Sequence, residues 1–458
     1  MILAAVAAYV LLQLGIAAWA ARGTADEDDY LVAGRTLGTL TVGLSLFATW
    51  FAAETVLATT AEVASNGLAG ARADPFGYAA GLAVLGAVLA GPLRRSGVVT
   101  IADFLRRRFG PGSEGLATGV VALSGTVWAG AQLYAFSVVL AGLTGLGFGA
   151  ALAAVTVLVL AYTLLGGLKG DVVTDAVQGV VLAVGMVVVA ALVWQRADPG
   201  AVTPDRLALL PPGEPILGQA ELWLLPILGT IVSQEAVSRV LAARNEAVAW
   251  RGAWLGAGLY LAVGGLPVLI GLLAPTMGLD LAEGDALLTD LAGTILPGWA
   301  HAVLVGALLS AILSSVDSAL LAVSAVVTEN VVLRRRPGMP ARARLRAARL
   351  TTLGAGGLAV LVAVSGESLR GLVLEASAIA GILVVPVVLG IVTAWGGARA
   401  ALVSMVVSGG AYAAMGWVIG VPGAYLWATA AGLAAYALTA WASARSRPTG
   451  DRSARPAR

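Results

Sequence analysis

The feature that most constrains this chain is a series of long apolar runs, separated by short segments rich in charge, glycine or proline. Most of the runs approach the roughly 20 residues that a helix needs to cross the hydrocarbon core of a bilayer. Hydrophobic residues make up 59% of the 458 residues and charged residues only 12%, a composition too apolar for a soluble domain. The sequence therefore predicts an all-α polytopic membrane protein.

About 13 transmembrane helices can be delimited by reading apolar runs between charged, glycine and proline residues. The candidate spans are residues 2–20, 38–64, 75–93, 115–143, 147–166, 172–194, 219–242, 248–276, 298–333, 348–365, 371–394, 398–419 and 422–443. No basic segment precedes the first run and no clear cleavage site follows it, so we expect a retained helix rather than a signal peptide. Because no loop is long enough to bury a core, we expect one transmembrane domain over residues 1–458, with a basic cytoplasmic tail at 445–458.

Residue types that are missing or rare exclude several classes of protein. The chain has no cysteine and one histidine, His301, so a zinc site built from Cys or His and a Ser-His hydrolase are both unsupported. No GxxxxGK[ST] motif occurs, and the chain is not expected to hydrolyse a nucleotide by itself. The chain is therefore predicted not to be an enzyme. Either a gradient supplies its energy, or the protein is a channel or a receptor.

The distribution of basic residues predicts the orientation in the membrane. With the N-terminus outside, the positive-inside rule places all but four of the 28 lysines and arginines on the inner side. The four exceptions are Arg72, Arg196, Arg206 and Arg370. The C-terminus is then cytoplasmic, in a multi-pass protein of the inner (plasma) membrane. Basic segments beside membrane spans favour contact with lipid headgroups, so the bilayer is an expected partner and nucleic acid is not.

Polar residues inside the apolar spans are the strongest functional signal, because a carboxylate at mid-membrane costs roughly 2.5–3.5 kcal/mol on insertion scales. On the ninth span the polar residues share one face: Ser310, Ser314, Asp317, Ser324 and Thr328, with Ser318 beside them. Asp171, Thr174, Asp175 and Gln178 form a second such face on the sixth span. Hydroxyl and carboxylate oxygens suit Na⁺ or a proton, although membrane hydroxyls often only bond to their own helix.

Two spans carry small and polar residues in mid-membrane, a pattern typical of interrupted helices. The second span contains Gly43-X-Ser45 and the segment 48–54, and the seventh contains Pro226, Gly229 and the segment 230–235. Interrupted helices in corresponding halves of a chain indicate a transporter built from inverted repeats, in which unwound backbone frees carbonyl oxygens for ions and substrate.

At these positions the chain resembles the sodium:solute symporter family. The resemblance covers nearly the whole length. The motifs that carry it are Gly34-Arg35, residues 162–167 and 174–178, Gln234 with Arg239 and Ala242-Ala243, and residues 314–318 followed by Thr328-Glu329. The family implies a LeuT-type fold of five plus five helices. Spans 2–6 (about 38–194) would form the first repeat and spans 7–11 (about 219–394) the second, with additional helices at both ends.

The resemblance also implies ligands for Na⁺. The general sodium site of the family falls on the backbone carbonyls of Ala48 and Phe51, the carbonyl of Ala311 and the hydroxyls of Ser314 and Ser315. A second sodium site, present in some members, falls on Asp175, Asp317 and Ser318. The alternative for the second set is that the carboxylates only stabilise the polar faces or tune the first site.

Within the family the N-terminal half is most similar to the choline-transporter branch, which surrounds a quaternary ammonium with aromatic rings. Trp50, Tyr78 and Trp128 match three of its ring positions, whereas Ser233 replaces a fourth ring. Glu54 replaces a small residue, and a carboxylate there would pair with an amine. Gln234 adjoins Ser233 and completes the predicted substrate site. The alternative is that the tryptophans only pack.

The sequence thus predicts a sodium-coupled secondary active symporter that imports a small organic solute, an amine or amino-acid-like compound, by alternating access. Na⁺ and the solute are the expected partners. A proton-coupled porter of the same fold remains an alternative, with Glu54, Asp175 and Asp317 as proton carriers, and a solute sensor is a further one. The solute, the ion stoichiometry and the oligomeric state stay open.

Overall fold

The computed structural model describes residues 33–211, 213–366 and 368–445, together with positions 11 and 15. Side chains between residues 165 and 176 are outside the described set. The predicted first span at 2–20 and the basic tail beyond residue 445 also lie outside it. Within the described residues the chain is helical and has no strand.

The helices before residue 212 include two long ones, α8 and α9, and several short or irregular ones. Short 3₁₀ and π turns carry the label η. The elements are η2 (Ala33–Arg35), α3 (Thr39–Trp50), η3 (Glu54–Ala58), α4 (Thr59–Asn66), η4 (Gly67–Ala71), η5 (Arg72–Gly77), α5 (Tyr78–Val84), η6 (Leu85–Ala90), α6 (Gly91–Ser96), α7 (Ile101–Phe109), α8 (Pro111–Thr144), α9 (Phe148–Arg196), η7 (Pro199–Ala201) and η8 (Pro204–Leu207).

The second half again combines long helices with bent ones. Its elements are α10 (Ile216–Val232), α11 (Gln234–Ala242), α12 (Glu246–Leu273), η9 (Ala274–Met277), η10 (Gly284–Ala286), α13 (Leu287–Ile295), α14 (Gly298–Val327), η11 (Thr328–Leu333), α15 (Ala341–Ser365), α16 (Leu369–Gly381), α17 (Val384–Val392), α18 (Ala398–Tyr412), η12 (Ala413–Ile419) and α19 (Ala424–Arg445).

Helix α14 is the centre of the bundle. Together with η11 it has the most enclosed apolar stretch among the candidate spans, 94% of which is buried. Helices α3, α8, α9 and α15 pack around it. The polar face predicted for the ninth span therefore faces protein, and Ser310, Ser314, Ser315, Asp317 and Ser318 are all buried.

The interruption predicted in the second span is present. Helix α3 stops at Trp50, and Phe51 leaves the helical region with φ −84° and ψ 71°. The amide of Ala52 donates to the carbonyl of Trp50 (3.0 Å) and not to Ala48, the acceptor that a continuous helix would use. The chain then resumes as the π turn η3 and helix α4. The break thus frees the Ala48 carbonyl from its helical donor.

The interruption predicted in the seventh span is also present. Helices α10 and α11 meet at Ser233, whose φ of −66° and ψ of 133° are extended, and their axes differ by 45°. Helices α16 and α17 form a second bent pair, also at 45°. The predicted 24-residue-long runs around residues 219–242 and 371–394 are therefore each two helices in sequence.

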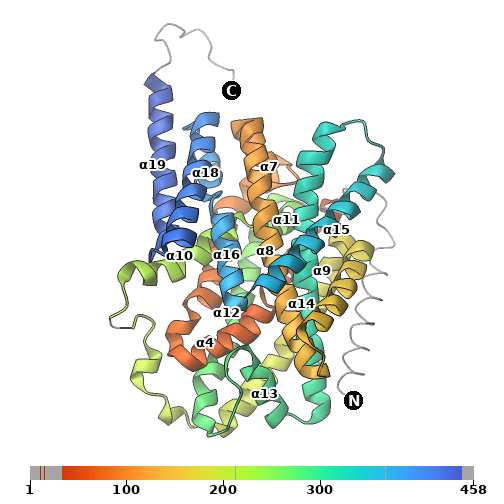
Figure 1. The fold of residues 1–458 in the computed structure, drawn as a ribbon, viewed down its shortest axis with the longest axis vertical. Coiled ribbons are helices and arrows are strands. Elements are labelled where there is room, and N and C mark those ends of the chain that lie inside the picture. Colours follow the sequence, from red (N-terminus) through yellow and green to blue (C-terminus); the bar gives the residue numbers. More distant parts are fainter. Residues whose placement is uncertain (1–10, 12–14, 16–32, 212, 367, 446–458) are drawn as a thin grey trace.

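The remaining helices frame this core. Seven described helices are long and apolar enough to cross a membrane, or up to nine if each bent pair is one span, while α3 and the segment Phe148–Leu164 are shorter apolar helices. The fold class is confirmed, but the count of 13 is not. Helices α18 and α19 pack against each other on one flank of the bundle (Figure 1).

Candidate transport site

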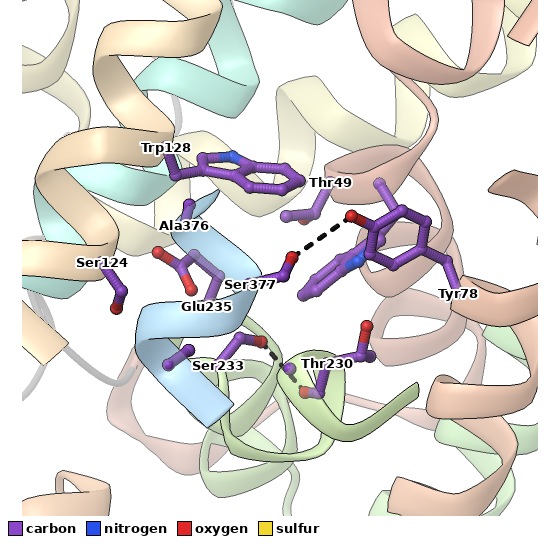
Figure 2. Close-up of a pocket in the computed structure, with 12 residues that line it drawn as sticks. Thr49, Tyr78, Ser124, Trp128, Thr230, Ser233, Glu235, Ala376 and Ser377 are labelled. Atoms are coloured by element: carbon purple, nitrogen blue, oxygen red, sulfur yellow. Dashed lines mark hydrogen bonds between the residues drawn. The ribbon is translucent and has the colours of Figure 1, made fainter. Parts of the chain in front are cut away.

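A small cavity of about 30 Å³ lies between the two helix breaks. It is lined by Thr49 and Trp50 from α3, Tyr78 from α5, Ser124 and Trp128 from α8, Gly229, Thr230, Ser233 and Glu235 from the α10–α11 region, and Ala376, Ser377 and Ala380 from α16. Figure 2 shows the labelled side chains of this lining converging on one space.

Two of the predicted aromatic residues form one wall of the cavity. The ring centroids of Trp50 and Trp128 are 6.3 Å apart, and the ring planes are tilted by 44°. Tyr78 is buried and its hydroxyl is 3.2 Å from the hydroxyl of Ser377. Three of the residues predicted to contact the solute therefore lie together, and Ser233 lines the same cavity.

The cavity also contains polar groups that lack a protein partner. Among the described residues, the indole nitrogens of Trp50 and Trp128 and the hydroxyl of Thr230 are buried without a hydrogen bond. Because an unpaired buried donor costs roughly 1–3 kcal/mol, such groups are rare in finished protein cores. Their presence around a cavity indicates a ligand with polar atoms.

Glu235 is the acidic residue of this cavity, and it was not among the residues predicted to contact the solute. It is buried, with 8% of its surface exposed. In the view of Figure 2 its carboxylate lies below Trp128 and beside Ala376. Within the described part of the chain it makes no ion pair, because the hydrogen bond from Arg239 reaches its backbone carbonyl (3.1 Å). The signal that could have found it is its position directly after the Ser233 break.

Glu54 and Gln234, in contrast, are not among the residues that line the cavity. Glu54 is buried beyond the first break, in η3. Gln234 faces α7, where its amide oxygen accepts from the backbone amide of Ile101 (3.0 Å) and its amide nitrogen donates to Ser238 (3.0 Å). Each of these residues follows a helix break. The break changes the direction in which successive side chains point, so both side chains point away from the cavity.

The predicted ligands of the first Na⁺ site come from two elements that meet in the structure. Helix α14 packs on α3, and the hydroxyl of Ser315 donates to the carbonyl of Thr49 (3.2 Å), one residue after Ala48. Ser314 and Ser315 are both buried. Carbonyl and hydroxyl oxygens without a cationic side chain among them form a donor set that suits a hard monovalent cation.

The predicted second Na⁺ site is only partly described. Asp317 and Ser318 are buried in α14, and the hydroxyl of Ser318 accepts a hydrogen bond from Arg239 (2.5 Å). Arg239 also donates to Ser45 of α3 (3.2 Å). Asp175 belongs to α9, but its side chain lies outside the described residues. A guanidinium therefore lies beside the oxygens that were predicted to bind a second ion.

A larger cavity of about 360 Å³ lies on the side of the α13 segment. Leu57, Tyr134 and Leu369 line it together with the acidic residues Asp285 and Asp290. Burial and, to a smaller extent, the charge of Glu62 raise the pKa of Asp285 above its ordinary value. The negative charges at this opening would attract cations.

A network of charged residues ties the helices together at the opposite end. Arg334 donates to Asp103 of α7 (2.9 Å) and Glu114 of α8 (2.8 Å), and Asn330 donates to the same two carboxylates (2.8 and 3.0 Å). The hydrogen bond to Glu114 raises the pKa of the Arg334 guanidinium, which stays charged. The helix that carries the Ser314-Ser315 pair is thereby anchored by the turn that follows it, η11.

Comparison with known proteins identifies the family. The sodium:solute symporter family profile matches residues 30–408. The chain belongs to that family. Its members are transporters and not enzymes, which confirms the predicted class of membrane protein and supports Na⁺ as the coupling ion.

The relatives carry different solutes. The chain is 27% identical to the high-affinity choline transporter 1 of Drosophila melanogaster, over 70% of this chain and 55% of that protein. It is 26% identical to the sodium/pantothenate symporter of Escherichia coli, over 89% of both chains. The chain thus spans just over half the length of the Drosophila relative, and choline and pantothenate are chemically different solutes.

Solved structures show the same fold at low sequence identity. A Na⁺-coupled sialic acid symporter in a substrate-bound outward-open state superposes with a TM-score of 0.82 and 18% identity, over 97% of each chain. The nucleobase-cation-symport-1 transporter MHP1 gives a TM-score of 0.59 at 14% identity. The predicted LeuT-type architecture is therefore present.

Proposed function

We propose that this protein is a sodium-coupled symporter that imports a small amine or amino-acid-like solute through the cavity between the two helix breaks. The observation that carries the proposal is the cavity itself, with the Trp50–Trp128 wall beside the buried carboxylate of Glu235. Membership of the family supports Na⁺ as the coupling ion and a Na⁺ gradient as the source of energy.

The chemistry of the lining favours a cationic solute. A desolvated cation gains roughly 0.5–2 kcal/mol over an aromatic face, and the tilted pair of indoles presents two faces. The Glu235 carboxylate is buried and forms no ion pair among the described residues, although the charge of Arg239 acts on it. An ammonium group in the cavity would neutralise it directly. The cavity therefore stabilises a bound ammonium group more than it stabilises a neutral sugar.

The orphaned donors suggest a second polar end on the solute. The indole N–H groups and the Thr230 hydroxyl can donate to a carboxylate or a hydroxyl group. A molecule with an ammonium at one end and an acceptor at the other, such as an amino acid or an amino alcohol, would satisfy both sets. The narrow space between the lining side chains limits this solute to a small one.

Na⁺ would bind where α3 and α14 meet, with the carbonyls of Ala48, Phe51 and Ala311 and the hydroxyls of Ser314 and Ser315 as ligands. The contact between Ser315 and the Thr49 carbonyl supports this assignment. Ion binding would hold the two helices together, and Thr49 and Trp50 next to the site also line the cavity. Release of Na⁺ would thus loosen one wall of the solute site.

The orientation proposed for the protein has the N-terminus outside and the C-terminus in the cytoplasm, in the inner (plasma) membrane. Figure 1 shows α13 at one end of the bundle and the basic connection between α14 and α15 at the other. The acidic cavity then opens outward and the Arg334 network faces inward. The interior-negative potential, worth about 2.3 kcal/mol per charge per 100 mV, would drive Na⁺ in that direction.

A thermal-shift screen of the purified protein tests the proposal. Amines, amino acids, sugars and carboxylates are added with NaCl or with KCl, and a ligand of the native state raises the apparent melting temperature. We expect stabilisation by one amine or amino-acid class, larger in NaCl. Stabilisation by neutral sugars alone would overturn the solute class, and equal stabilisation in both salts would overturn sodium coupling.

The hit from the screen is then measured with Glu235→Gln, and with Glu283→Gln as a control on an exposed outer loop. Loss of the buried charge should weaken binding of the cationic solute by on the order of tenfold, about 1.4 kcal/mol. The control should bind as the wild type does. Flux into proteoliposomes, driven by Na⁺ or by a pH gradient alone, separates the symporter from the proton-coupled porter and from a sensor.

A further inference from the structure

Beyond the first helix break, two buried carboxyl groups lie in a setting that neither the sodium ligands nor the solute cavity explains. Glu54 of η3 and Asp74 of η5 each have 6% of their surface exposed. Their charges act on each other, and the phenol of Tyr78 lies near Glu54. The second carboxylate oxygen of Glu54 is buried and has no hydrogen-bond partner. Two adjacent buried carboxylates cannot both stay ionised without a cation.

Asp74 belongs to a closed ring of hydrogen-bonding oxygens. The hydroxyl of Thr55 is 2.8 Å from one carboxylate oxygen of Asp74, and the hydroxyl of Tyr260 is 2.8 Å from the other. The two hydroxyls are themselves 2.6 Å apart. The Thr55 hydroxyl is also 3.1 Å from the carbonyl of Trp50. These side chains are fully buried, with Thr55 and Tyr260 at 0% exposure.

The ring lacks a proton if Asp74 is ionised. Three contacts close it, but Thr55 and Tyr260 supply one proton each, and a carboxylate supplies none. One contact would then join two oxygens with no hydrogen between them. A proton on Asp74 supplies a third hydrogen. The three hydrogens can then either close the ring or fill two ring contacts and the contact to the Trp50 carbonyl.

The spacing of the oxygens indicates a proton and not a metal ion. Separations of 2.6–2.8 Å are those of O–H···O hydrogen bonds. Oxygens that share a metal ion repel one another and surround it at wider spacing. One carboxylate oxygen of Glu54 is also buried without a hydrogen-bond partner. A proton on either carboxyl group would reduce the negative charge of the pair.

Neighbouring charged groups do not supply this charge directly. The groups that face the pair are the phenols of Tyr78 on α5 and Tyr260 on α12, and Arg370 at the start of α16. Arg370 forms an ion pair with Glu62 of α4. Asp285 of η10, which packs on η3, adds a further acid near Glu62. The pair is therefore surrounded by more acids than bases.

We propose that Glu54 and Asp74 form a proton-binding site on the far side of the first helix break, separate from the sodium ligands and from the solute cavity. The site is connected to the cavity through two residues. Thr55 contacts the carbonyl of Trp50, and Tyr78 reaches both Glu54 and Ser377. Loss of the proton draws the Thr55 and Tyr260 hydroxyls onto Asp74 and away from Trp50. Solute binding then depends on pH through the cavity wall.

Infrared spectroscopy of the purified protein in lipid tests the site without any solute or flux, so its result is independent of the proposed transport function. At neutral pH the wild type should show the carbonyl stretching band of a protonated carboxyl, shifted in D₂O. The double variant Glu54→Gln, Asp74→Asn should lose the band, and the exposed control Glu283→Gln should keep it.

Three outcomes would overturn the proposal. The first is a wild type without the band at neutral pH. The second is a band that survives in the double variant. The third is a band that appears only when NaCl is replaced by N-methyl-D-glucamine chloride, because the pair would then hold Na⁺. If the double variant does not fold, Tyr260→Phe keeps both carboxyls and removes one ring hydroxyl. The band should then shift in frequency, and an unshifted band would also contradict the assignment.

Discussion

The two helix breaks look alike in sequence but leave different groups available. At the first break, Ala52 donates to Trp50, so the Ala48 carbonyl loses its helical donor. At the second break, the carbonyl of Thr230 is taken by the amide of Ser233 (3.2 Å) and by the hydroxyl of Ser233 (3.1 Å). The first break therefore offers oxygen to an ion, while the second is satisfied by its own residues.

The comparison suggests that the two helix breaks have different roles, one at the proposed ion site and one at the solute cavity. Helix α3 ends with a free carbonyl next to the hydroxyls of α14, which is a setting for a cation. Helix α11 begins with a capped turn, and its first acidic residue, Glu235, faces the cavity. The following variants test this division between an ion break and a solute break, from the largest expected effect to the smallest.

Ser315→Ala should affect the first break most. The substitution removes a hydroxyl that lies against the α3 break, and a hydrogen-bonding group that contacts a charge contributes roughly 1.5–3 kcal/mol. We expect Na⁺ affinity, measured with ²²Na⁺ on purified protein, to fall by on the order of ten- to a hundredfold. Ser404→Ala, in a buried serine of the peripheral helix α18, should leave it unchanged. If Ser315→Ala has the same Na⁺ affinity as the wild type, then Na⁺ does not bind at the first break.

Gly229→Ala should strain the second break and spare the first. A Cβ at Gly229 would lie 2.8 Å from the backbone carbonyl oxygen of Ser377, which cannot move without displacing α16. Overpacking of this kind costs about 1–3 kcal/mol, so the melting temperature in detergent should fall. Gly258→Ala on α12, where the added group meets open space, is the control. If both variants melt alike, the close approach of α10 and α16 is not rigid.

Ser233→Ala should weaken the second break more gently. It removes the cap in which the Ser233 hydroxyl accepts from the amide of Ala236 (3.4 Å), a change worth about 1 kcal/mol of stability. Na⁺ affinity should stay within about twofold of the wild type, since about 0.4 kcal/mol corresponds to that factor. Ser233→Thr keeps a hydroxyl and should retain most of the stability. A large loss of Na⁺ binding in Ser233→Ala would show that the two breaks are not separate in function.

Asp285→Asn, in the turn η10 before α13, should give the smallest effect. Burial and the charge of Glu62 raise the pKa of Asp285 above its value of 3.8, so the folded protein binds this proton more tightly than the unfolded chain does. Its contribution to stability is present below pH 3.8 and is lost as the pH rises through the folded pKa. The variant should therefore gain stability relative to the wild type between acid and neutral pH, as followed by melting temperature. A difference that is constant with pH would contradict this origin.

The breaks themselves could be predicted from sequence, since clusters such as Gly229, Thr230 and Ser233 inside an apolar run weaken a helix locally. The aromatic wall could be predicted as well, through the resemblance to a family. The direction of side chains beyond each break could not. Helical periodicity assigns faces only while the turn stays regular, and a π turn at Glu54 and an extended residue at Ser233 change the phase. Glu54 was consequently placed in the cavity, where Glu235 lies instead.

The second sodium site shows another limit. Sequence spacing places Asp317 and Ser318 on the polar face of one helix, but it says nothing about what a different helix inserts beside them. Arg239 comes from α11 and donates to Ser318. Contacts between distant segments depend on the packing angles of whole helices, which local patterns do not encode. The assignment of Asp175 to a second ion site stays a prediction.

The burial of α14 on all sides has a consequence for how the protein is made. A helix with Asp317 and several serines on one face is a poor candidate to enter lipid by itself, because its polar groups would meet hydrocarbon. Three of the helices that enclose it, α3, α8 and α9, come earlier in the chain, and only α15 follows it. During synthesis the ribosome therefore delivers most of the protein wall before it delivers α14. The order of the helices along the chain is thus also an order of assembly, in which α14 is made after most of the helices that enclose it.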